Sequence, residues 1–175
     1  GKAVTLIKAQ PAPTDPSDTQ RYTANKYAAM VTHAESMRLY VTKGGGGEQA
    51  EAGITAFKDY IAVETDPAKK AKAQIDMAQM LLDAGAPDKA LTEFKAILAT
   101  TPDSPEANLG AGLAVYAIGD KAKFQEAANY IQRFVEVAPD TNPMKNDAKE
   151  ILAALKASEN ITPEKTGRPP RKPRP

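Results

Sequence analysis

The string ALTEFK at residues 90–95 decides the fold, because nearly the same string, GITAFK, stands at residues 53–58. The two strings are 37 residues apart, and self-similarity at a fixed interval of this size is typical of stacked structural repeats. A small residue, a large apolar residue and a proline, spaced by four and then eight residues, occur twice, as Ala90, Phe94 and Pro102 and as Ala127, Ile131 and Pro139. The chain is therefore predicted to repeat one helical hairpin.

Apolar residues recur in steps of three and four along most of the chain, which predicts seven amphipathic helices. Glycine and proline clusters separate them. The first helix is expected from about Asp18 to the run Gly44–Gly47, and Asp66 and Pro67 supply an N-cap and a first-turn proline for the third. The other expected boundaries are about 48–63 for the second helix, 84 for the end of the third, 87–100 for the fourth, breaks at 119–120 and 138–139 after the fifth and sixth, and 143–158 for the seventh.

The two ends of the chain differ from this helical pattern. Residues 1–20 are expected to form an extended arm, because a short β-prone run at 3–7 is followed by Pro11, Pro13 and Pro16. Residues 159–175 form a second arm, rich in proline and with five Lys or Arg against two Glu. Proline favours the polyproline II conformation, which loses little entropy on docking. The arm residues expected to contact another chain are Val4, Leu6, Ile7, Arg168, Pro169, Pro170, Arg171 and Pro173.

The repeat resembles the tetratricopeptide repeat (TPR) family, which places a small residue, an aromatic residue and a proline at these offsets in a unit of roughly 34 residues. The resemblance implies an all-α, TPR-like solenoid of about three hairpins with a C-terminal capping helix, covering residues 21–158. The chain departs from the family in lacking the first-helix Trp, in its 37-residue spacing, and in having Gly53 and Thr65 where Ala and Pro are expected. The residues expected to pack the repeats together are Phe57, Ala78, Ala90, Phe94, Pro102, Gly112, Ala127, Ile131 and Pro139.

Composition limits the chemistry that the chain can perform. It has no Cys, one His, a net charge of +1 and no run of 18 apolar residues. Thiolate chemistry and a multi-His metal site within one chain are thereby excluded, and neither nucleic-acid binding nor a membrane span is expected. No cofactor or metal is expected.

The sequence gives little support to catalysis. The carboxylate pairs Glu64/Asp66 and Asp147/Glu150 lie at helix ends or on polar faces, where such groups usually cap helices. His33 is expected to be a solvated or partly buried structural residue. The chain is therefore interpreted as a protein without enzymatic activity.

Glycine positions carry information about packing. The run Gly44–Gly47 lacks the Lys and Ser or Thr of a phosphate-binding loop and follows a helix, so it is interpreted as a hairpin turn. Gly110 and Gly112 lie inside a predicted helix, where each costs about 1 kcal/mol relative to Ala. Close approach of a neighbouring helix would offset that cost.

Two functional hypotheses remain, both based on protein–protein interaction. In the first, the chain is a self-assembling structural subunit, whose open repeat ends stack head to tail into an oligomer or filament while the arms clasp neighbours. In the alternative, it is a TPR adaptor that holds a peptide or helix of a different protein in a concave groove, with Gln74 and Asn108 on the binding face.

The expected location is secreted or extracellular, with a periplasmic or cytoplasmic protein as the alternative. A chain that begins at Gly1 without Met is compatible with a processed or trimmed terminus. Asn160, Ile161 and Thr162 match the acceptor pattern for N-glycosylation. Asn160 is therefore a candidate glycan site.

Overall fold

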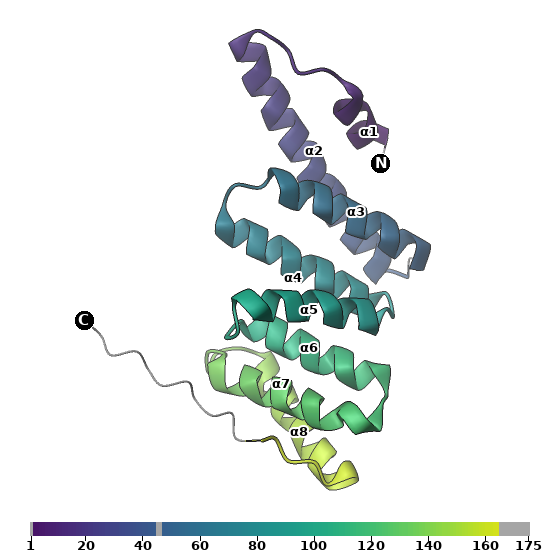
Figure 1. The fold of residues 1–175 in the computed structure, drawn as a ribbon, viewed down its shortest axis with the longest axis vertical. Helices are drawn as coiled ribbons and strands as arrows, with labels where there is room; N and C mark the ends of the chain where they lie inside the picture. Colours follow the sequence, from purple (N-terminus) through teal and green to yellow (C-terminus); the bar gives the residue numbers. More distant parts are fainter. Residues whose placement is uncertain (1, 45–46, 165–175) are drawn as a thin grey trace, which may run out of the picture. The chain divides into compact units, whose positions relative to one another are not determined.

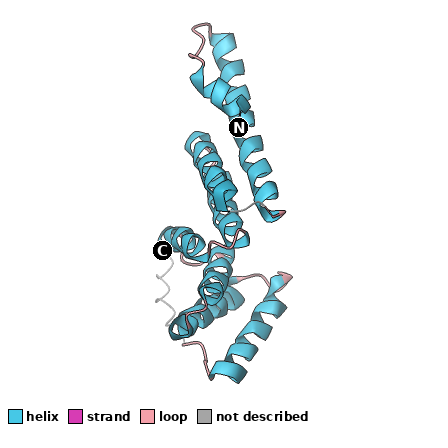
Figure 2. Ribbon diagram, turned by 90° about the vertical axis from the view of Figure 1, so that its right-hand side faces the viewer, coloured by secondary structure: helices cyan, strands magenta, loops and turns pink. Residues whose placement is uncertain are grey.

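The computed structural model describes residues 2–44 and 47–164, and every regular element within them is helical (Figures 1 and 2). The prediction of an all-α fold is confirmed. The chain forms two compact units that divide inside α5, between Glu93 and Phe94. The elements are α1 Lys2–Ala9, α2 Pro16–Thr42, α3 Gly47–Val63, α4 Pro67–Asp83, α5 Pro87–Thr100, α6 Pro105–Ile118, the short 3-10 helix η1 Lys121–Lys123, α7 Phe124–Val137 and α8 Met144–Glu159.

Three helices begin with the same local device, a side-chain cap followed by proline. The Asp66 carboxylate accepts hydrogen bonds from the backbone N–H groups of residues 68 and 69, and Pro67 occupies the first turn of α4. Asp15 before α2 and Ser104 before α6 act in the same way. Such caps satisfy backbone donors that have no partner inside the helix. The predicted start of α4 is confirmed, and the device explains why the starts of these three helices can be found from sequence.

The N-terminal segment is not the extended arm expected from the sequence. Residues 2–9 form α1, which folds back beside α2 (Figure 1), and Val4 is buried there. Lys8 forms an ion pair with Asp59 of α3 at 2.5 Å. A β-prone run is stabilised as a strand only when it pairs with another strand. Here it is stabilised as a helix, because an amphipathic helix can bury its apolar face against α2. Pro16 does not prevent a helix but begins one, so only the connection at residues 10–15 is non-helical.

The first unit has its core between α2, α3 and α4. Phe57 of α3 and Met80 of α4 are almost completely buried, together with Met30 of α2. A Cβ atom at Gly53 would lie 2.5 Å from the Met80 sulfur. Gly53 therefore departs from the expected Ala because the Met80 side chain fills the space over this turn of α3.

The second unit packs α6 against α7, and α7 against α8. A Cβ atom at Gly110 would overlap the Phe94 ring, and one at Gly112 would lie 2.5 Å from Ile131. Both large side chains thus rest directly on the backbone of α6. This close approach is the compensation expected for two glycines within a helix.

Candidate protein-interaction surfaces

The residues predicted to pack the repeats divide into two groups. The two prolines, Pro102 and Pro139, are exposed and lie two residues after the ends of α5 and α7. Proline at such positions stops a helix from continuing. The others are buried: Phe57, Ala78, Ala90, Phe94, Gly112, Ala127 and Ile131.

An open groove of about 770 Å³ lies in the first unit, between the N-terminal half of α2 and the turn from α3 to α4. It lies where α2, with 27 residues, extends beyond α3, with 17, and where α1 packs beside α2. Its α2 wall is formed by Gln20, Tyr22, Thr23, Ala24, Lys26 and Tyr27, and its other wall by Val63, Glu64, Thr65, Asp66 and Lys69.

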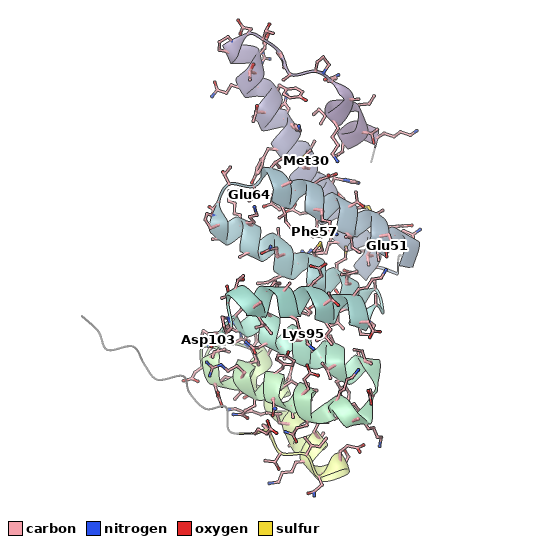
Figure 3. All side chains as sticks on the ribbon, viewed as in Figure 1. Met30, Glu51, Phe57, Glu64, Lys95 and Asp103 are labelled. Atoms are coloured by element: carbon pink, nitrogen blue, oxygen red, sulfur yellow. The ribbon has the colours of Figure 1, made fainter. Side chains whose placement is uncertain are left out.

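The Glu64 carboxylate, labelled in Figure 3, lines this groove and connects its two walls. Its Oε2 accepts hydrogen bonds from the hydroxyls of Tyr27 at 2.6 Å and Tyr60 at 3.1 Å. Its Oε1 accepts hydrogen bonds from the backbone N–H groups of Thr65 at 2.9 Å and Asp66 at 2.8 Å. The carboxylate therefore joins α2 to the α3–α4 turn, a role that capping alone does not describe.

These hydrogen bonds shift the pKa values of all three side chains. The Tyr27 hydroxyl and the backbone N–H of Asp66, the two largest favourable causes, lower the pKa of Glu64 to about 2. The pKa of Tyr60 is raised, first by burial and then by its bond to Glu64, and the pKa of Tyr27 is raised by its bond to Glu64. Charge-assisted bonds of this kind favour the ionised carboxylate. Glu64 is thus a structural anion whose acceptor positions are occupied, which leaves it poorly suited to act as a general base.

Two lysine ammonium groups line the groove, those of Lys26 and Lys69. Neither Lys26 nor Lys69 forms an ion pair within residues 2–44 and 47–164. The Lys26 ammonium lies 5.9 Å from the centre of the Tyr22 ring. Because the Lys26 and Lys69 ammonium groups form no ion pair there, while both oxygens of Glu64 accept hydrogen bonds within the protein, these two lysines can donate to acceptors that a ligand supplies.

A second surface, on α7 in the second unit, already holds an extended segment of chain. The Gln125 amide donates to the Thr162 carbonyl at 2.9 Å. The side-chain oxygen of Asn129, Oδ1, accepts a hydrogen bond from the backbone N–H of Glu164 at 2.9 Å. The side-chain nitrogen of Asn129, Nδ2, donates to the Glu164 carboxylate at 3.2 Å. Ile161 packs on the apolar cluster of Phe124, Ala128 and Leu155. We call this set the α7 surface: Phe124, Gln125, Ala128 and Asn129 of α7, together with Leu155 of α8.

The residues predicted for the assembly arms have several different environments. Val4 is buried, Ile7 is partly buried, and Leu6 is 66% exposed on the outer face of α1. Asn160, the candidate glycan site, is exposed at the C-terminal end of α8. The other predicted arm residues lie outside the described residues: Arg168, Pro169, Pro170, Arg171 and Pro173.

Asn108, His33 and Gln74 differ in their burial. Asn108 does not face a partner, because its side chain is 3% exposed and donates to the carbonyls of Pro102 and Ser104. The prediction that it lines a binding face was wrong, since a polar side chain near a helix start can serve the preceding turn instead. His33 is partly buried, and burial lowers its pKa. Gln74 is exposed on α4.

Within the described ranges, no cluster of three or more His, Asp or Glu side chains is arranged to hold a metal ion. None of the described helices is both long enough and apolar enough to cross a bilayer.

Comparisons with protein-family models, with curated proteins and with solved structures gave no match. The resemblance to the tetratricopeptide family stays a prediction, and it rests on the repeated residues.

Proposed function

We propose that this chain is a non-enzymatic protein–protein interaction protein with a TPR-like solenoid, and that its principal partner is another copy of itself. The observation that supports the proposal best is the extended segment 161–164 on the α7 surface. A helix face that binds main-chain groups of an extended segment is a ready receptor for a polypeptide.

The α7 surface has the two features of a peptide receptor. Gln125 and Asn129 bind a carbonyl and an N–H that every extended chain possesses, which gives affinity without demanding a particular sequence. The apolar cluster beneath Ile161 adds a side-chain preference. Stacking of repeat ends would place such receptors at regular intervals along an assembly.

The mass of the purified full chain in solution tests this proposal. We expect multi-angle light scattering after gel filtration to give a mass that rises with protein concentration, and negative-stain microscopy to show oligomers or filaments. A constant monomer mass at all concentrations would contradict self-assembly.

The groove of the first unit supports a second candidate, an adaptor that binds a different polypeptide. Its free donors, Lys26 and Lys69, favour an acidic segment. A fluorescently labelled acidic peptide should bind the wild-type protein more tightly than a basic peptide of equal length. The double variant Lys26→Glu/Lys69→Glu should lose this preference, while Lys43→Glu/Lys70→Glu, with the same charge change outside the groove, should retain it. Equal binding of both peptides by wild type would argue against the adaptor.

A further inference from the structure

We infer that the C-terminal segment 161–164 exchanges between two copies of the chain, with Asn160 as the hinge and the α7 surface of one copy receiving the segment of the other. The inference rests on the proposed self-assembly and identifies the surface and the segment that would produce it. Three features of the second unit carry it.

First, the contacts of the segment can be reproduced in another copy. They run from Thr162 and Glu164 to two amide side chains on α7, and from Ile161 to an apolar cluster on α7 and α8. The receptor is therefore formed by helices and not by the segment itself. A second copy presents the same receptor, so an exchanged segment would form the same hydrogen bonds and bury the same side chain.

Second, the hinge is a single residue in an unfavourable backbone conformation. Asn160 has φ +56°, and among the described residues it is the only one other than glycine with positive φ. This left-handed conformation turns the chain back at the end of α8, where the N–H of Ile161 reaches the Leu155 carbonyl at 3.3 Å. L residues disfavour it, although Asn tolerates it better than most.

Third, an open form removes that unfavourable conformation. If Asn160 adopted helical φ and ψ, α8 would gain a residue and the segment would leave its own α7. The freed segment would then be available to the α7 surface of a second copy. Short hinges under strain are a known route to exchanged dimers, because the closed form carries a cost that the exchanged form avoids.

A matched pair of substitutions at the hinge tests the inference in the full chain. Asn160→Gly adopts positive φ without steric cost and should favour the closed monomer. Asn160→Ala strongly favours the helix and should favour the exchanged dimer. We expect the dimer dissociation constant of Asn160→Ala to be lower than that of Asn160→Gly by about tenfold or more. Both variants lack the glycan acceptor, so glycosylation does not affect the comparison.

Complementation then tests which surfaces meet. One variant, Gln125→Ala/Asn129→Ala, keeps the segment but loses the receptor amides, and another, Ile161→Asp, keeps the receptor but loses the apolar anchor. On the Asn160→Ala background, the mixture should form a heterodimer through one intact exchange, and each variant alone should dimerise more weakly than the mixture. Circular dichroism of each variant serves as the control, and it should show that the helices are retained.

The outcomes separate the two ideas. If the wild type self-associates but neither the hinge pair nor the mixture changes the association, exchange is wrong and self-assembly by another surface stands. If the wild type and Asn160→Ala are both monomeric at all concentrations, exchange and self-assembly are both wrong.

Discussion

The turn at residues 64–66 and the turn at residues 101–104 stand 37 residues apart in the repeat, yet different groups stabilise them. The first, between α3 and α4, lies around the ionised Glu64 carboxylate and its four donors. The second, between α5 and α6, contains Pro102 and is held by the buried neutral amide of Asn108. Repetition therefore conserves the place of a turn and not the interactions within it.

The difference explains a departure from the repeat pattern. Thr65 stands where Pro102 stands in the next repeat, and its backbone N–H donates to Glu64. Proline has no N–H and would remove that hydrogen bond. On the outside of the second turn, Asp103 forms an ion pair with Arg133 (Figure 3 labels Asp103). Since Asp103 is 67% exposed, the pair contributes little to stability.

Substitution of the aromatic residues that precede the two turns should give the largest loss of stability. Phe57 and Phe94 occupy the same place in the repeated strings, and both are almost completely buried. Each substitution to Ala should lower the free energy of unfolding by about 3–5 kcal/mol, because it removes buried apolar surface and leaves a cavity. Urea denaturation measures the change, with exposed Lys58→Ala as the control. A loss below about 1 kcal/mol at one site would show that the two positions are not equivalent.

The neutral turn should be weakened by Asn108→Ala at every pH. The substitution removes two hydrogen bonds and leaves the Pro102 and Ser104 carbonyls with one fewer donor. The free energy of unfolding should fall by about 1–3 kcal/mol. Asn146→Ala, at an exposed position on α8, is the control and should have almost no effect. If the loss of unfolding free energy in Asn108→Ala varied strongly with pH, an uncharged amide could not be the group that stabilises this turn.

The charged turn should make stability depend on pH in the acid range. The pKa of Glu64 is about 2 in the fold against 4.5 normally, so the unfolded chain binds the proton more tightly. The stabilisation is complete above about pH 4.5 and is lost as pH falls towards 2. Glu64→Gln should reduce the change of the urea midpoint with pH in this range, and exposed Glu106→Gln should not. If the urea midpoint of Glu64→Gln changed with pH as much as that of the wild type, Glu64 would not be the cause of the pH dependence.

A smaller pH effect should come from His33, which lies near Lys8 and Asp59 in the first unit. Burial lowers its pKa from 6.5, so stability is full above 6.5 and declines as pH falls through the lowered value. Because His33 is the only histidine, its ring proton can be followed by NMR without ambiguity. A titration midpoint above 6.5 would show that a favourable partner outweighs burial.

Local patterns predicted much of the fold, and what they failed to predict about α1 and Glu64 has one cause. Asp66 and Pro67 marked the start of α4 because capping involves neighbours in sequence. Residues 2–9 were expected to be extended because of their β-prone run. The helix that they form instead depends on packing against α2 and on the Lys8–Asp59 pair. In the candidate sites, Tyr60 lies in the last turn of α3 and Glu64 directly follows that helix, so their spacing was visible in the sequence, but Tyr27 lies 37 residues from Glu64. Contact across such a distance has no local signal.

The amino-acid sequence by itself determined the helical class, the repeat interval and the caps and breaks at most helix ends, because these follow from side-chain periodicity and from bonds between neighbouring residues. Only the tertiary structure decided that α1 folds back, that Glu64 joins two elements and that residues 161–164 lie on α7. Each of these depends on surfaces that come together only when the helices pack, since burial and long-range hydrogen bonds do not exist in the separate segments.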